Sequence, residues 1–273
     1  MTQHEPSRRT TNIGAVSFLN ARPLTLGLDD HADIRLTYAV PADLAALLES
    51  GGLDVALVPV IDTLRRPKRW PLVTDACIAC DGATLTVRVF SRVDPADITV
   101  LHVDGDSHTS VALARVLWQE RHHRRLDMVR FSHGAAGDDG AAYLDGCQAI
   151  LLIGDKVIKP PVALDAFSTQ VDLGATWKSL TGLPFVFAAW ATTGQPPPAF
   201  VLAALTEARD KGVARAAEIA AELGPGLGWP ADLAVGYLTR HLNFTMTERH
   251  REGMKCFFEL VEKHIDSREL VLQ

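Results

Sequence analysis

Ile13-Gly14-Ala15-Val16-Ser17-Phe18-Leu19-Asn20, with Pro23 shortly beyond it, is the stretch that decides the fold. Its small and apolar residues predict a buried strand that stops where polar Ser17 and Asn20 begin. In an open α/β sheet, ligands bind in the crevice beyond the carboxyl ends of the strands. Ser17 and Asn20 are therefore candidate ligand contacts, although Asn and Pro also favour turns for purely local reasons.

Two later strands are predicted to end in the same manner. A helix that begins at Pro41 and stops at Gly51-Gly52 leads into the apolar strand 53–58. The strongly apolar strand 149–153 ends at Gly154-Asp155, which we interpret as another crevice contact. Strand, helix, strand with buried strands is typical of a parallel sheet covered on both faces.

A second α/β run starts with the predicted strand 99–103, which is followed by an amphipathic helix from Val111 to about Glu120. Thr109 and Ser110 stand at its predicted N-cap. The backbone N–H groups of a helix N-terminus form an anion site. The two hydroxyl residues therefore either bind an anion or simply cap the helix. A short helix is also predicted over 141–144, and a disordered tail over 1–11.

The region 72–91 predicts two strands joined by a tight turn at Asp81-Gly82. The second of these strands alternates, which puts Thr86 and Arg88 on one face and Val87 and Val89 on the other. Beyond the triple proline 196–198, which continues neither helix nor strand, the pattern is almost entirely helical: 199–211, 213–223, 231–241 and 247–264.

Composition excludes several classes of protein. The 273 residues are 47% hydrophobic and 22% charged, which is enough to bury a full core. The net charge of −6 argues against a nucleic-acid surface. No stretch approaches the roughly 20 apolar residues of a membrane span, and the polar N-terminus is not of the secretory type, which predicts a cytoplasmic protein. Oligomeric state cannot be predicted from these features.

Familiar catalytic motifs are missing from the sequence. It has no Gly-x-Ser-x-Gly elbow, no phosphate loop and no dinucleotide fingerprint. The spacing of Cys77 and Cys80 fits a metal or redox site, but a single pair within a strand pattern favours buried apolar cysteines. Of the histidines, His102 and His108 flank the possible anion site and are kept as acid–base candidates.

A set of short stretches, in this order along the chain, resembles the chorismate dehydratases, which open the futalosine route to menaquinone. The resemblance covers about residues 13–260. The stretches are Val16-Ser-Phe-Leu-Asn20, Gly52-Leu-Asp-Val-Ala-Leu57, Ile78-Ala-Cys-Asp-Gly82, Thr109-Ser-Val-Ala-Leu113, Leu151-Leu-Ile-Gly-Asp155 and Leu180-Thr-Gly-Leu-Pro-Phe-Val-Phe187.

The resemblance implies an α/β fold like that of the type II periplasmic binding proteins, with a ligand cleft between two lobes. Lobe one would comprise 12–92 and 194–273, and lobe two 93–193. The composition break after Ser91 and the proline run fit these boundaries.

The reaction implied by the resemblance removes water from chorismate to give 3-[(1-carboxyvinyl)oxy]benzoate, without metal or organic cofactor. Aromatisation drives the reaction, so the protein mainly binds and orients a dianion. The base would be the enolpyruvyl carboxylate of the substrate. By motif, Asn20 and Thr86 would be catalytic, Thr86 standing where the family usually has Ser. Substrate contacts would come from the remaining matched positions: Ser17, Asp81, Gly82, Thr109, Ser110, Gly154 and Asp155.

The chain also departs from the family pattern. Arg22 and Arg88 replace small or apolar residues, Cys80 a Ser, His108 an Arg and Lys156 an acidic residue. The two new arginines would either strengthen dianion binding or indicate a different anionic ligand.

Two alternative functions stay open. One is a non-catalytic cytoplasmic binding protein for a small carboxylate, since the same architecture binds solutes. The other is the later naphthoate synthase of the same pathway, whose opening motif differs.

Overall fold

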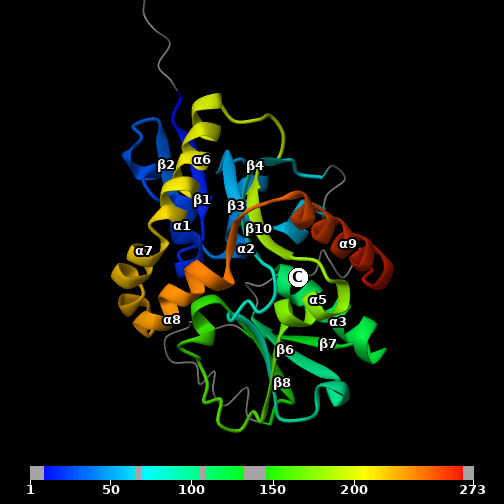
Figure 1. Cartoon of the computed structure of the whole chain (residues 1–273). Coiled ribbons are helices and arrows are strands. Elements are labelled where there is room, and N and C mark those ends of the chain that lie inside the picture. The colour runs from blue at the N-terminus through cyan, green and yellow to red at the C-terminus, as the bar shows by residue number, and fades with distance from the viewer. Residues whose placement is uncertain (1–8, 65–68, 105–107, 132–145, 267–273) are drawn as a thin grey trace, which may run out of the picture.

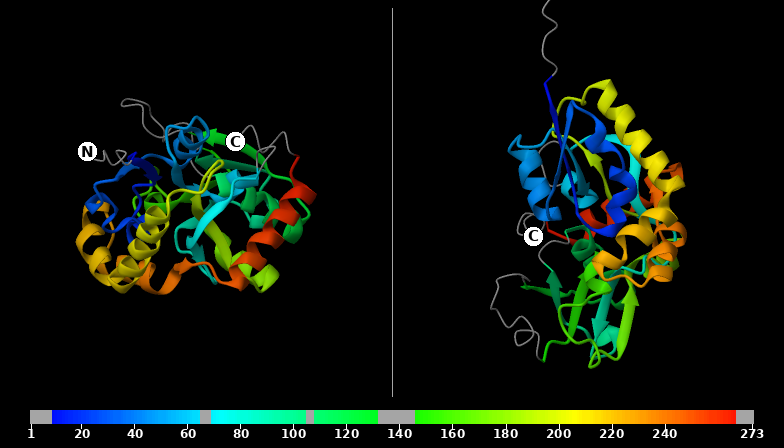
Figure 2. Two further views of the ribbon diagram at one scale, coloured as in Figure 1. Left: turned by 90° about the horizontal axis from the view of Figure 1, so that it is seen from above. Right: turned by 90° about the vertical axis from the view of Figure 1, so that its left-hand side faces the viewer.

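The computed structural model describes residues 9–64, 69–104, 108–131 and 146–266, and it contains two β-sheets. In Figure 1 the six-stranded sheet occupies the upper part of the molecule and the five-stranded sheet the lower part. The right-hand view of Figure 2 shows the two parts stacked along the long axis. The chain is thus divided into two α/β lobes, as the sequence predicts.

The six-stranded sheet is built around the opening strand. Its order is β11-β4-β10-β3-β1-β2. The strands are β1 (Thr11–Ala15), β2 (Ile34–Tyr38), β3 (Val55–Pro59), β4 (Leu72–Cys80), β10 (Phe185–Ala191) and β11 (Asn243–Thr245). Strand β1 pairs in parallel with β2 and β3, while β10 runs antiparallel to β3 and β4. Strand β3 is buried along its whole length, as expected of a parallel strand covered on both faces.

The five-stranded sheet has the order β7-β6-β8-β5-β9. Its strands are β5 (Val87–Ser91), β6 (Val100–Asp104), β7 (Asp127–Phe131), β8 (Ala149–Ile153) and β9 (Thr169–Asp172). Strand β6 pairs in parallel with β7 and β8, and β5 runs antiparallel to β8 and β9. The predicted alternation of β5 is confirmed, because Val87 and Val89 join one core cluster and Phe90 joins another.

The helices cover both sheets and join the lobes. They are α1 (Arg22–Thr25), α2 (Pro41–Glu49), α3 (His108–His122), α5 (Leu173–Thr181), α6 (Ala199–Ala214), α7 (Ala216–Leu223), α8 (Ala231–Gly236) and α9 (Glu248–His264), and a π-helical turn (Tyr237–His241) follows α8. Helices α6 and α7 flank the upper lobe in Figure 1. One apolar cluster contains side chains from both sheets and from α3, α5 and α9, so the two lobes share a core. No helix among the described residues is long and apolar enough to cross a membrane.

Two strands, β5 and β10, belong to the opposite lobe from the one that the predicted boundaries assign to them. The sequence division places residues 87–91 in lobe one and 185–191 in lobe two. In the structure β5 belongs to the five-stranded sheet, and β10 is the central antiparallel strand of the six-stranded one. The breaks in composition come one strand later than the changes of sheet, because each crossing is short. We propose that the crossings are residues 81–86 and 182–184.

Three local predictions also need correction or fall outside the structure. Asp81-Gly82 does not close a hairpin, because the strands on its two sides lie in different sheets. The predicted disordered tail is wrong for residues 9–11, because Thr11 pairs with Ile34 and Arg9 forms an ion pair with Asp54 at 3.1 Å. Residues 1–8 and the predicted helix 141–144 lie outside the described residues.

Candidate active site

A cavity lies between the two sheets and collects side chains from both lobes. Lobe one supplies part of its apolar wall, and the start of α3 supplies polar groups from lobe two. Its described lining is Val16, Phe18, Asn20, Pro41, Leu57, Pro59, Ile78, Thr84, Thr86, Val87, His108, Thr109, Ser110, Ile153, Gly154, Phe187, Ala188, Tyr237 and Leu242. Five of the predicted site residues therefore meet in one hollow: Asn20, Thr86, Thr109, Ser110 and Gly154.

Asn20, Thr86 and Tyr237 form a polar group on one wall. The Thr86 hydroxyl lies 2.7 Å from the Tyr237 hydroxyl, and both side chains are buried. Burial raises the pKa of the Tyr237 phenol well above its ordinary value, although Thr86 and Asn20 beside it act in the opposite direction. Asn20 Oδ1 is buried without a hydrogen-bond partner among the described residues. A ligand with a hydroxyl donor would satisfy this acceptor.

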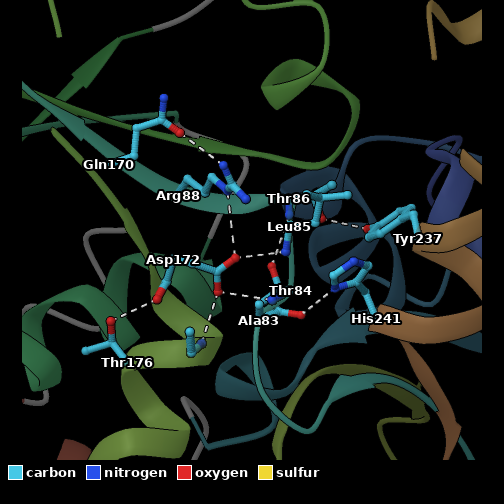
Figure 3. Close-up of polar contacts among 11 residues, drawn as sticks. Ala83, Thr84, Leu85, Thr86, Arg88, Gln170, Asp172, Thr176, Tyr237 and His241 are labelled. Carbon is cyan, nitrogen blue, oxygen red and sulfur yellow. Dashed lines mark hydrogen bonds and ion pairs between the residues drawn. The ribbon is translucent and has the colours of Figure 1, made fainter. Parts of the chain in front are cut away.

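Asp172 fixes the crossing segment that carries Thr84 and Thr86 (Figure 3). Its carboxylate accepts hydrogen bonds from the backbone N–H groups of Thr84 at 3.0 Å and Leu85 at 2.8 Å. The same carboxylate caps α5 through the Ala175 N–H at 3.0 Å. Leu85 has a φ of 69°, a left-handed conformation that is unfavourable for residues other than glycine. The two cavity threonines thus flank a strained residue held in place by Asp172.

The start of α3 supplies the second polar wall of the cavity. Helix α3 begins at His108 within the described residues, so Thr109 and Ser110 lie in its first turn rather than at the predicted N-cap. The Ile61 N–H donates to Thr109 Oγ1 at 3.3 Å, which leaves the threonine proton free to donate elsewhere. Hydroxyl groups beside a helix N-terminus are suited to an anion.

Gly154 brings lobe two against the opening loop of lobe one. It has a φ of 56°, and a Cβ built there would lie 3.0 Å from Phe18 Cδ2, which shows how closely the two segments approach. Asp155, the next residue, accepts from the Leu19 N–H at 3.3 Å and from Trp229 Nε1 at 2.9 Å. Asp155 therefore joins the lobes instead of lining the cavity, which corrects its expected position among substrate contacts.

Asp155 leads to a prediction about stability. Burial raises the pKa of its carboxyl, while Trp229, the Leu19 N–H and Arg22 lower it less strongly. A raised pKa means that the folded protein binds the proton more tightly than the unfolded chain, so this group's contribution to stability is lost as pH rises through the raised value. Asp155→Asn keeps an acceptor but does not ionise, so we expect the variant to gain stability relative to the wild type as pH rises. Urea unfolding at several pH values between about 3 and 7 would measure this difference.

Asp155→Ala is the control, because it removes the acceptor at every pH. We expect it to lower the free energy of unfolding by about 1–3 kcal/mol at neutral pH, since two donors lose their partner. Equal pH dependence of Asp155→Asn and the wild type would contradict the prediction.

Three other predicted contacts lie outside the cavity lining. Ser17 is exposed, and its carbonyl accepts from the Arg22 guanidinium at 3.0 Å. Asp81 is exposed and forms an ion pair with Lys178. Gly82 follows it in the crossing with a φ of 130°. Asp81 and Gly82 lie in the segment that leads into Thr84 and Thr86, which do line the cavity.

The structure also shows where the residues that depart from the family pattern lie. Arg22 stacks on the Tyr38 ring at 4.6 Å, and Arg88 donates to Gln170 at 3.0 Å. Neither arginine is among the described lining residues, and neither is Lys156. Burial raises the pKa of the Cys80 thiol to about 12, so it stays a thiol.

Sequence reasoning missed Tyr237 and Thr84. Tyr237 lies in a helical region without a recognisable motif, and its role depends on a contact with a residue 151 positions away. Thr84 had a usable signal, because it is two residues from Thr86 in a polar crossing. Of the two histidine candidates, His108 lines the cavity and His102 does not. The described residues contain no group of three metal-ligating side chains.

Two α/β lobes with a cavity between them place the protein in the class of periplasmic-binding-protein-like folds. A solved protein of Archaeoglobus fulgidus matches 95% of this chain and 98% of its own with a TM-score of 0.70 at 14% identity. The periplasmic aliphatic sulphonate binding protein of Escherichia coli matches 96% of this chain and 92% of its own with a TM-score of 0.59 at 15% identity. The predicted fold class is confirmed.

Sequence comparison then gives the family. A family model described as menaquinone biosynthesis matches residues 11–263, and the chain belongs to this family. The chorismate dehydratase of Thermus thermophilus is 31% identical over 270 residues, which cover 87% of this chain and 95% of that protein.

Proposed function

We propose that this protein is a chorismate dehydratase, a hydro-lyase that converts chorismate to 3-[(1-carboxyvinyl)oxy]benzoate in the futalosine route to menaquinone. The observation that carries the proposal is the meeting of Asn20, Thr86, Thr109 and Ser110 in one cavity between the lobes. The identity with the Thermus enzyme supports the same reaction.

The two polar walls would divide the work of binding. The Thr109 and Ser110 hydroxyls, with the first-turn N–H groups of α3, would hold a carboxylate of the dianion. Asn20 and Thr86 would contact the part of the ring that reacts, with the open Asn20 Oδ1 accepting from the ring hydroxyl. Apolar residues between these walls, among them Leu57 and Phe187, would enclose the ring.

The proposed reaction needs few catalytic groups from the protein. One ring hydrogen and the neighbouring hydroxyl leave, and the ring becomes aromatic. Positioning is then the main catalytic contribution. No described lining residue carries a carboxylate side chain, so we assign the proton acceptor to the enolpyruvyl carboxylate of the substrate. Neither metal nor organic cofactor enters this scheme.

The test is incubation of the purified protein with chorismate, followed by mass spectrometry and ultraviolet absorbance. We expect loss of 18 mass units, the mass of one water, together with new benzoate absorbance. Tight binding of chorismate without conversion would instead favour a non-catalytic carboxylate-binding protein. The Asn20→Ala variant serves as the control for contaminating activity, because it should retain the fold but lose turnover.

A further inference from the structure

We infer that His108, held by Asp62, donates the proton that allows the ring hydroxyl to leave as water. This inference rests on the proposed dehydratase function and adds a catalytic residue and a positioning residue to it. Both residues lie in the described part of the chain, and they come from segments 46 residues apart.

The two side chains form a buried pair at the cavity. His108 Nδ1 lies 3.0 Å from each oxygen of the Asp62 carboxylate. The exposed fractions of the side chains are 6% for His108 and 2% for Asp62. Asp62 belongs to the 3-10 helix Val60–Leu64, and the hydrogen bond between Ile61 and Thr109 ties this helix to α3 a second time. The imidazole is therefore fixed in orientation.

This geometry determines which nitrogen carries which proton. A carboxylate accepts hydrogen bonds, so the contact assigns a proton to Nδ1. His108 lines the cavity and its Nδ1 is held by Asp62, so the proposed proton transfer is assigned to the other ring nitrogen, Nε2. A carboxylate in this position also stabilises the imidazolium, as Asp does for His in the serine protease triad. The charged ring is a donor at Nε2.

The remaining polar groups of the lining are poor proton donors. They are the hydroxyls of four Ser and Thr residues and of Tyr237, together with the Asn20 amide. Burial raises the pKa of Tyr237, so its phenol keeps its proton. Imidazole is the side chain that ordinarily changes charge between about pH 5 and 8. Among the described lining residues, Tyr237 is the other titratable side chain, and Asp62 contacts His108 at Nδ1.

The step balances without any oxidant or additional reactant. The ring C–H bond breaks and its proton passes to the enolpyruvyl carboxylate, while the C–H electrons form the new ring double bond. The C–O bond breaks, and the Nε2 proton of His108 joins the departing oxygen to form water. The imidazole is left neutral, and the proton on the enolpyruvyl carboxyl returns to it through solvent when the product leaves.

The inference can be tested with a substrate analogue whose leaving group departs without being protonated. The probe is the chorismate analogue in which chlorine replaces the ring hydroxyl, because it gives the same product and chloride leaves as an anion. We expect His108→Gln to reduce kcat for chorismate at least about 100-fold, and to reduce kcat for the chloro analogue by no more than about threefold. Asp62→Asn should show the same selectivity, with a loss of about tenfold or more for chorismate.

Ser110→Ala is the matched control, since it changes the same wall without removing a proton donor. It should raise KM for both compounds to the same extent. Turnover of the chloro analogue reports that His108→Gln is folded. If His108→Gln folds poorly, the test uses His108→Ala with added imidazole instead. Restored turnover of chorismate would support the inference, and failure of imidazole to restore turnover would count against it.

Two results would overturn the assignment of His108. One is a His108→Gln variant that dehydrates chorismate at the wild-type rate. The other is a variant that loses turnover of both compounds equally, because that result indicates a positional role alone. A wild-type protein that leaves chorismate unchanged would instead overturn the proposed function, and the inference with it.

Discussion

Asn20→Ala should reduce kcat for chorismate about 10³-fold, which is the upper range for removing one positioned polar group from an active site. Asn20 lines the cavity, and its Oδ1 has no hydrogen-bond partner among the described residues. The protein therefore loses little when this oxygen is removed, whereas the substrate loses a hydrogen-bond partner near the reacting carbons. Steady-state kinetics together with urea unfolding measure both effects.

The free energy of unfolding should stay within about 1 kcal/mol of the wild type in this variant. Asn243→Ala is a suitable control, because that residue lies in the same lobe but outside the cavity lining. It should leave kcat unchanged. Loss of stability that parallels the loss of turnover would make Asn20 a structural residue of the opening loop.

Asp172→Ala should have the largest effect on folding, with turnover lost as a consequence. The substitution removes the acceptor for three backbone N–H groups, those of Thr84, Leu85 and Ala175. We expect the free energy of unfolding to fall by about 2–4 kcal/mol, at about 1 kcal/mol for each of the three lost bonds, one of which is the cap of α5. We also expect kcat to fall about 100-fold, because the crossing no longer holds Thr86 in register.

Leu85→Gly distinguishes the two consequences of losing Asp172. Glycine adopts the positive φ of this position without the strain that leucine carries. In the Asp172→Ala background, Leu85→Gly should therefore recover part of the turnover even if stability remains low. If turnover does not recover, the strain at Leu85 is not the reason why the crossing needs Asp172.

Local patterns predicted α/β sheets with buried parallel strands, whereas the two-lobed fold class and the shared cavity were implied by the resemblance to the chorismate dehydratases. The apolar strands β3 and β8 are buried along their lengths, and each is followed by residues at the cavity or beside it. The pattern also indicated Gly154, which directly follows β8, and Asn20, which lies five residues beyond the end of β1. Such residues are predictable because the carboxyl end of a parallel strand faces the crevice.

The parts that could not be predicted depend on distant pairing. Asp155 looks like a ligand residue because it follows β8, but Leu19 and Trp229 occupy its oxygens. The role of Asp62 becomes visible only when α3 packs beside its turn and brings His108 to it. The change of sheet between β4 and β5 leaves no compositional mark, since a crossing of a few residues has the same polar character as a hairpin turn.

The distribution of the strands has a consequence for the order in which the protein is completed during synthesis. Every strand of the five-stranded sheet lies between Val87 and Asp172, so that sheet can form while the ribosome is still making the rest. The six-stranded sheet must wait for β10 and for its edge strand β11. Because Tyr237 also emerges late, Thr86 meets its hydroxyl partner only near the end of translation. The described lining of the cavity is therefore complete only after almost all of the chain has been synthesised.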